Sequence, residues 1–283
     1  MRVPARLAAI GLLIGPGLYL GLAAHAAPAQ PPAPPPGRTP SPLAAHRALY
    51  ELTKDASTQS RGGREIAAAH GTMGYEVVDV CDGWATRQRL RMTITNSDGQ
   101  DTDMDSDYAT WEAKDGLSFR FHMVQKSDSS ITSQTDGSAH LTRTGGTGDV
   151  DYKLPKDTKA SLPAGTLFPM MHTLAIINAA REGKKFLALP LFDGTDDDGY
   201  EYSSIAVLDW KQPFSTDHAI LNSLPSTRVR IAFFDHANDA STPTYEVGMR
   251  YWENGVADAM QMDFGDFVMH AKLTELTPIP KRC

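Results

Sequence analysis

The sequence predicts a mainly β protein whose antiparallel sheet is built by successive hairpins. Apolar and polar residues alternate in several short runs, and this period of two is typical of a strand with one buried face. Pairs of Asp-Gly or Asn-Gly stand between such runs, and they favour hairpin turns because both central residues need positive φ. The alternating runs include "LSFRFHM", "RLRMTI" and "RVRIAFF", and the pairs include those at 98–99, 115–116, 136–137, 193–194, 198–199 and 254–255.

One stretch, "LFPMMHTLAIINAAREG", predicts a helix. Pro169 suits its first turn, Arg181 its last turn, and Gly183 its end. The apolar residues of this helix lie on almost all of its faces. We therefore expect it to be buried on every side, inside a curved sheet. The alternative is a helix that closes one end of a barrel. The residues that would be buried or would face a ligand are Met170, His172, Leu174 and Ile177.

A second, short helix is expected near the start of the folded region. In "SPLAAHRALYEL", prolines precede the segment, and Leu43, His46 and Tyr50 share helical spacing.

The first 42 residues predict export and a spacer. Residues 1–26 have a basic start, an apolar stretch and a small-residue exit, which is the pattern of a secretory signal peptide. A retained membrane anchor is the weaker alternative, because Gly15, Pro16 and Gly17 interrupt the apolar stretch. Residues 27–42 form a proline-rich linker that we expect to be disordered. Residues 43–283 then form a single domain, exported as a soluble protein that does not span the membrane once the signal is removed.

The charge of the chain is acidic. The formal net charge is −7, and removal of residues 1–26 takes away Arg2 and Arg6 and no acid, which gives −9. An acidic surface argues against nucleic acid as the main partner.

The chain has two cysteines, Cys81 and Cys283. Two cysteines in an exported chain usually form a disulfide, because the compartment is oxidising. The alternatives are a metal site, for which the close ligand spacing is missing, and a catalytic thiol, for which no base stands out.

Two acidic stretches suggest cation sites, each with a simpler interpretation. In "DTDMDSDYATWE", Asp101, Asp103, Asp105, Asp107 and Glu112 follow the spacing of a calcium loop, but Ser106 replaces its glycine. The same pattern describes the solvated face of an edge strand, which we prefer. In "FDGTDDDGY", four aspartates form the second stretch, at 193, 196, 197 and 198, and a turn is the simpler interpretation.

Catalytic motifs do not emerge from the sequence. His172 is the ionisable group within the apolar helix, and such a histidine is usually a hydrogen-bonded part of the core. The sequence contains no G-x-S-x-G elbow, no H-E-x-x-H pair and no glycine-rich phosphate loop. We therefore expect no enzymatic activity, no catalytic residues and no cofactor.

Several segments taken in order resemble the EipB family of periplasmic cell-envelope integrity proteins, first catalogued as a domain of unknown function. They are "SPLAAHRALYEL", "GTMGYEVVDVCDGW", "WEAKDGLSFRF", "LPAGTLFPMMH", "LFDG", "YEVGMRYWENGV" and the terminal Cys283.

The resemblance implies a spiral, cup-like open barrel with a helix inside it, and a disulfide between Cys81 and Cys283. It also implies a periplasmic, non-catalytic role in envelope integrity. We expect the protein to act by binding another periplasmic or envelope protein. The alternative is a carrier that holds an apolar ligand, a lipid or acyl chain, in the concave face of the sheet.

Overall fold

The computed structural model describes residues 43–57, 66–235 and 242–280. The predicted signal peptide and proline-rich linker lie outside these residues. Within them the chain forms a 14-stranded antiparallel sheet, the helix α1 (Pro169–Arg181) and a short 3-10 helix at Ala219–Leu221. The mainly β prediction is confirmed.

The first eight strands precede α1 and the other six follow it. The first group is β1 (His46–Lys54), β2 (Ile66–Asp79), β3 (Gly83–Asn96), β4 (Asp101–Ala113), β5 (Ser118–Ser127), β6 (Ser130–Leu141), β7 (Gly148–Leu154) and β8 (Thr158–Leu162). The second group is β9 (Phe186–Leu191), β10 (Glu201–Val207), β11 (Ser226–Asp235), β12 (Tyr245–Trp252), β13 (Ala257–Asp263) and β14 (Val268–Pro278).

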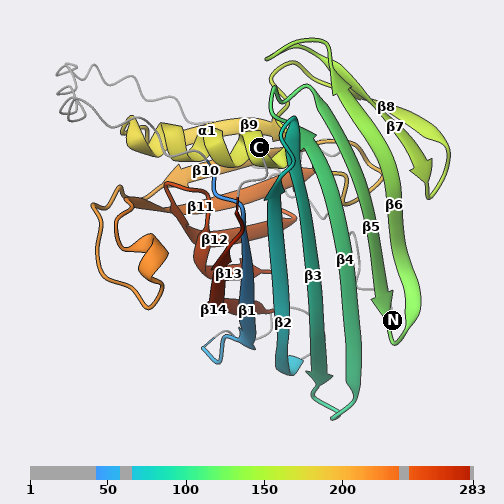
Figure 1. The fold of residues 1–283 in the computed structure, drawn as a ribbon. Helices are drawn as coiled ribbons and strands as arrows, with labels where there is room; N and C mark the ends of the chain where they lie inside the picture. The colour runs from blue at the N-terminus through green and yellow to red at the C-terminus, as the bar shows by residue number, and fades with distance from the viewer. Residues whose placement is uncertain (1–42, 58–65, 236–241, 281–283) are drawn as a thin grey trace, which may run out of the picture.

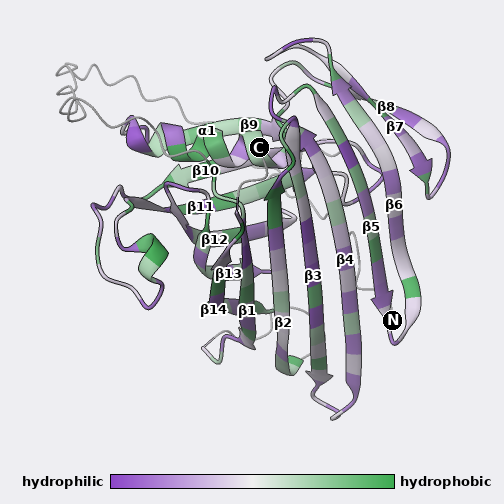
Figure 2. Ribbon diagram, viewed as in Figure 1, coloured by the Kyte–Doolittle hydropathy of each residue, from purple (hydrophilic) through white to green (hydrophobic). Residues whose placement is uncertain are grey.

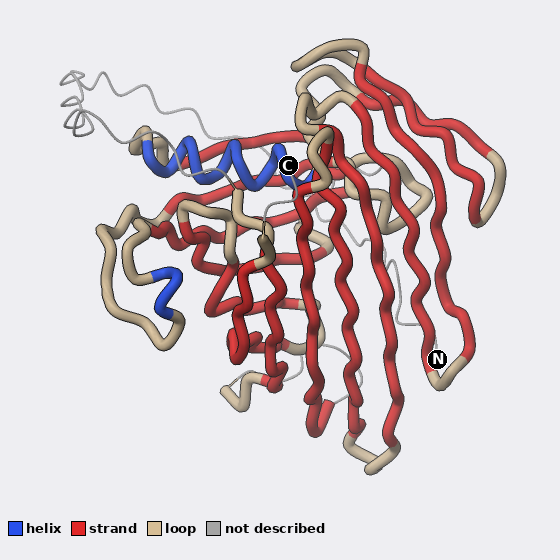
Figure 3. The backbone as a smooth tube through the Cα atoms, viewed as in Figure 1, coloured by secondary structure: helices blue, strands red, loops and turns tan. Residues whose placement is uncertain are grey.

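The strand order is β8-β7-β6-β5-β4-β3-β2-β1-β14-β13-β12-β11-β10-β9. Neighbouring strands of the sheet are consecutive in the chain, with one exception: β1 and β14 pair with each other and join the two groups within the sheet. The edge strands are therefore β8 and β9, and α1 lies between them in the chain. The sheet curls so that the two groups face each other, with α1 near the top of the curve (Figures 1 and 3).

The short helix expected near residue 46 is wrong, because His46–Lys54 forms strand β1. Its residues also alternate, with Ala48, Tyr50 and Leu52 almost fully buried. Strands β2 and β14 pair with it on both sides, so the ladder satisfies its backbone groups. Tertiary pairing thus overrides the local helical spacing.

Most of the predicted turns are present. Gly99, Gly116 and Gly255 have φ of 76°, 70° and 85° in the hairpin connections β3–β4, β4–β5 and β12–β13. Gly194 and Gly199, with φ of 73° and 97°, lie in the loop between β9 and β10.

The turn predicted at Asp136-Gly137 is wrong, because these residues lie inside β6. The hairpin between β5 and β6 turns instead at Asp128 and Ser129, whose φ angles are 49° and 67°. Gly137 serves close packing rather than a turn, since a Cβ there would lie 2.5 Å from the Asp151 carbonyl oxygen.

The expected alternation is visible along the strands (Figure 2). Phe119, Phe121 and Met123 are all buried on one face of β5. The two phenylalanines form an aromatic cluster with Phe168 and Phe192, in which ring centroids lie 5.0–6.3 Å apart. This cluster brings the segments before α1 and after β9 onto the strands of the first group.

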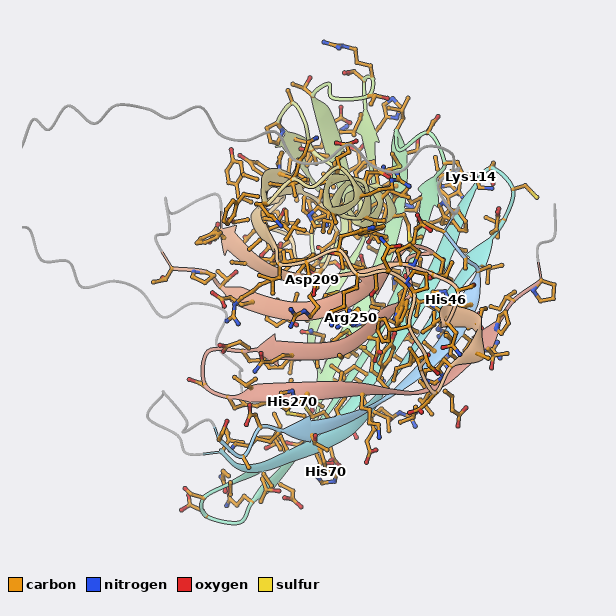
Figure 4. All side chains as sticks on the ribbon, turned by 90° about the vertical axis from the view of Figure 1, so that its left-hand side faces the viewer. His46, His70, Lys114, Asp209, Arg250 and His270 are labelled. Carbon is orange, nitrogen blue, oxygen red and sulfur yellow. The ribbon has the colours of Figure 1, made fainter. Side chains whose placement is uncertain are left out.

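The helix α1 lies within the curve of the sheet, as the apolar pattern predicts. No residue from Phe168 to Arg181 is fully exposed. Ile176 packs in the large core formed mostly by β1 and the second group of strands, whereas Ile177 packs against Val77 and Trp84 of the first group. Figure 4 shows the helix nearly end-on, with strands above and below it. Leu174 departs from the expectation, since it is only partly buried.

Candidate functional site

A cavity of about 310 Å³ lies beside the first turn of α1, in the concave interior of the sheet. The first turn contributes Pro169, Met170, His172 and Thr173, and strands of both groups supply the other walls. The helix therefore lines the concave space without filling it.

The first turn of α1 is held by a buried carboxylate from β4. Glu112 is 1% exposed, and its Oε2 and Oε1 atoms accept hydrogen bonds from the backbone N–H groups of Met170 (2.7 Å) and Met171 (2.9 Å). The N-terminal N–H groups of a helix lack partners within the helix and carry partial positive charge, so a carboxylate suits them. Phe168, which precedes the helix, provides no side-chain cap. Glu112 takes that role from another part of the chain.

The environment of Glu112 opposes its charge. Burial raises the pKa of Glu112 to about 7, and the hydrogen bonds from Met170 and Met171 offset only part of this effect. The anchor of the helix is therefore a group that titrates near neutral pH.

His172 belongs to a buried hydrogen-bonded chain. Its Nε2 atom lies 2.8 Å from Oγ of Ser203, and the Ser203 hydroxyl donates to the carbonyl oxygen of Leu189 at 2.8 Å. Because that hydroxyl has one proton, His172 acts as the donor in this pair. Burial lowers the pKa of His172 to about 4, which keeps the ring neutral. This arrangement orients α1 against β9 and β10 and offers no activated serine.

The tyrosine hydroxyls of the cavity are also directed at protein groups. Tyr50 donates to the carbonyl oxygen of Ala257 at 2.8 Å, and Tyr108 donates to that of Asp193. Burial raises the pKa of both tyrosines. His46 (labelled in Figure 4) lies 2.7 Å from the carbonyl oxygen of Ala44 through Nδ1, and burial lowers its pKa.

The four aspartates at 101, 103, 105 and 107, which have the spacing of a calcium loop, do not lie close to the carboxylate of Glu112. They lie along β4, where Asp103 accepts from the Thr93 hydroxyl at 2.8 Å and Asp107 accepts from the Arg87 guanidinium at 2.7 Å. Residues of like parity share one face of a strand, so Glu112 projects to the opposite, interior face. A calcium loop must wrap its ligands around the ion, and a straight strand cannot do so. The preferred edge-strand interpretation also needs correction, because β4 is paired on both sides and only its face is solvated.

The second acidic stretch forms the loop between β9 and β10. Asp193 accepts from the backbone N–H of Thr195 at 3.0 Å and Asp196 from that of Asp198 at 3.0 Å, as in Asx turns. Burial raises the pKa of Asp196 to about 6 and that of Glu201 to about 8. Within residues 43–57, 66–235 and 242–280, no group of three or more metal-binding side chains is arranged to hold an ion.

Of the two cysteines, Cys81 lies in the described turn after β2, with φ of 76°. Asp79 accepts from the Cys81 backbone N–H at 3.0 Å and from the Lys114 ammonium at 2.6 Å (Lys114 is labelled in Figure 4). Cys283 lies outside the described residues, so the disulfide stays a prediction.

Two features of the site were missed by sequence reasoning, the Glu112 anchor and Gln88. Gln88 lines the cavity, and its side-chain amide makes no hydrogen bond to any described residue. Parity along β4 gave a signal for Glu112, since it shares a face with buried Thr110 rather than with the aspartates. For Gln88 the signal was also parity, since along β3 it shares a face with Leu90 and buried Met92, but nothing in the sequence showed that this face borders a cavity.

In the described part of the chain, no helix has the length and hydropathy needed to cross a membrane.

The model of the EipB-like family matches residues 38–280. The cell envelope integrity protein EipB of Brucella abortus (strain 2308) is 29% identical over 240 residues, which is 83% of this chain and 84% of the relative. The crystal structure of a β-barrel-like protein of a domain of unknown function, also from Brucella abortus, superposes with a TM-score of 0.76 and 28% identity. That match covers 85% of this chain and 100% of the crystallised chain. The chain therefore belongs to the EipB-like family.

Proposed function

We propose that this protein supports the integrity of the cell envelope from the periplasm, as a binding protein without catalytic activity. The name of its Brucella relative supports the envelope role. The export signal expected at residues 1–26 supports the periplasmic location, since such signals direct chains out of the cytoplasm.

The geometry of the interior favours binding over catalysis. The histidine and tyrosine side chains described above are directed at protein acceptors or donors, and they are held neutral by burial. General acid–base catalysis needs a group that can exchange a proton with a substrate near the working pH. Glu112 titrates in that range, but both of its oxygens are occupied by the helix.

Two kinds of partner fit such a role, another envelope protein or an apolar ligand carried in the concave face. One observation favours an apolar ligand as the occupant of the interior. The helix α1 leaves a cavity of about 310 Å³, within the range of about 300–1,000 Å³ that is usual for ligand sites. A surface for a protein partner remains compatible with this, because the cavity does not use the outer face.

The test compares cells that lack the protein with cells that express it or the cavity-filling variant Ala257→Leu. Restored resistance to detergent and envelope stress is the expected result for the wild type. Crosslinking and pull-down from the same cells, with lipid analysis of the purified protein, then identify the partner. Full restoration by a variant with a blocked cavity would exclude the carrier and leave the protein partner. No effect of deletion on the envelope would overturn the proposal as a whole.

A further inference from the structure

We infer that the cavity binds an uncharged ligand, an apolar chain that carries one neutral hydrogen-bonding group such as an ester, amide or hydroxyl. The inference rests on the proposed binding function and specifies its ligand. Free carboxylates and phosphates are excluded from this cavity.

The volume sets the part of the ligand that enters. At about 310 Å³ the cavity lies at the small end of the range of about 300–1,000 Å³ that is usual for ligand sites. This volume suits a short chain or the end of a longer one, and it is too small for a whole two-chain lipid.

The walls are apolar and adaptable. Met73, Met170, Met249 and Met260 line the cavity from β2, α1, β12 and β13. Methionine has an unbranched, flexible side chain, and surfaces rich in it accept apolar groups of variable shape. A cavity walled in this way favours a flexible chain over one rigid shape.

The electrostatics of the cavity disfavour an anion. Neither lysine nor arginine lines it among the described residues. Its tyrosines and histidines are held neutral by burial. The buried carboxylate of Glu112 lies behind the first turn of α1. An anion in this cavity would lose its hydration without gaining a cation, which is strongly unfavourable.

Gln88 supplies the neutral polar contact. Its side chain faces the cavity and makes no hydrogen bond within the described ranges, whereas the neighbouring hydroxyls of Thr86 and Thr110 contact each other. A carboxamide both donates and accepts, so it matches a carbonyl or a hydroxyl and carries no charge. A site that offers a polar group without a partner selects ligands that can satisfy it.

The test measures binding of three matched probes to the purified mature protein at pH 7.5, below their micellar concentrations. They are a medium-chain fatty acid, its methyl ester and the corresponding alcohol. We expect the ester and the alcohol to bind at least tenfold more tightly than the ionised acid. Equal or tighter binding of the acid would overturn the inference, and so would failure of all three probes to bind.

Variants locate the site. Ala257→Leu adds a side chain into the cavity and should abolish binding of the ester, whereas Ala188→Leu, on the exposed face of β9, should not. Gln88→Leu should weaken binding of the ester and the alcohol while leaving binding of an alkane of equal length unchanged. Circular dichroism and thermal melting confirm that each variant is folded. Unchanged binding in folded Ala257→Leu would place the ligand elsewhere and overturn the inference, while the envelope role would still be decided by the deletion experiment.

Discussion

Glu112 accepts a hydrogen bond from the backbone N–H of Met170, a residue 58 positions later in the chain, at 2.7 Å. This contact ties the first turn of α1 to β4, and α1 is the element that connects the two edge strands of the sheet. Glu112 therefore holds the first turn of the helix beside the cavity, together with the hydrogen bond of His172 to Ser203 and the apolar packing of Ile176 and Ile177.

Replacement of the Glu112 side chain should destabilise the fold. Glu112→Ala leaves two buried N–H groups without acceptors, at about 1–3 kcal/mol each, while it also removes a buried carboxylate that is costly to desolvate. We expect a net loss of about 2–4 kcal/mol in the free energy of unfolding, measured by urea denaturation. Asp105→Ala, on the exposed face of the same strand, is the control and should change stability by no more than about 0.5 kcal/mol.

The same residue should give stability a distinct pH dependence. The pKa of Glu112 is raised from 4.5 to about 7, so the folded chain holds a proton that the unfolded chain releases between these values. The contribution of Glu112 to stability is thus greatest below pH 4.5 and declines as the pH rises through about 7. His172 acts oppositely, because its pKa is lowered to about 4.

For this reason the pH experiment compares the wild type with Glu112→Gln, which retains the other groups. From pH 5 to pH 8, the free energy of unfolding of the wild type should fall relative to that of Glu112→Gln. A difference that stays constant across this range would show that Glu112 is already ionised at pH 5.

Two residues of α1 should respond differently to truncation. Ile177 is 2% exposed and packs against Val77 and Trp84, so Ile177→Ala should cost about 2–5 kcal/mol. Leu174 is partly buried, so Leu174→Ala should cost clearly less. Thermal unfolding of both variants measures which loss of stability is larger. A larger loss for Leu174→Ala would contradict the deeper burial of Ile177.

Calcium should leave the melting temperature unchanged at millimolar concentration. Asp103 and Asp107 contact Thr93 and Arg87 across the sheet and face solvent, so they cannot surround an ion with Glu112. A ligand specific to the native state would raise the melting temperature by mass action. A rise of several degrees that is absent in Asp103→Ala would show that an ion is bound.

The disulfide remains a prediction, and the register of the sheet supports it. His46 pairs with Val77 of β2 and with Pro278 of β14, so both strands run toward the same end of the sheet on either side of β1. They are separated there by two strand spacings, about 10 Å. Cys81 follows Val77 by four residues and Cys283 follows Pro278 by five, which is enough chain to bring the two sulfur atoms together.

Accordingly, we expect the mature protein to show no free thiol until it is unfolded and reduced. Cys283→Ser and Cys81→Ser should lower the melting temperature equally, because each removes the same link. The chain-entropy model gives about 5 kcal/mol for a loop of this size, and β14 keeps its own ladder, so a few kcal/mol is expected. If only one of the two variants lost stability or function, that cysteine would have a separate role.

The fold was largely predictable from sequence because strand alternation and turn glycines are local signals. The buried face of β5, the turn at Gly116 and the helix beginning at Pro169 all follow from patterns within a few residues. The errors arose where distant strands decide the outcome. His46–Lys54 has helical spacing but is paired on both sides, and Gly137 is a glycine because another strand lies against it.

The candidate site was much less predictable. The partner of Glu112 is the backbone of a helix 58 residues away, and no side-chain pattern marks a backbone N–H group. The polar role of Gln88 depends on the cavity that it faces, which exists only after both groups of strands have curled together. His172 was predicted to be a core histidine, but no motif around Ser203 indicated that this residue would be its hydrogen-bond partner.

The seam between β1 and β14 also bears on how the chain reaches this structure. All other strand pairs are neighbours in sequence, whereas the seam joins residues such as Leu49 and Thr274, which are 225 positions apart. The entropy of closing a large loop is therefore concentrated in one ladder, and each half of the protein is a meander of low contact order. The walls of the cavity come from both meanders, so the cavity is complete only when the two are paired along β1 and β14.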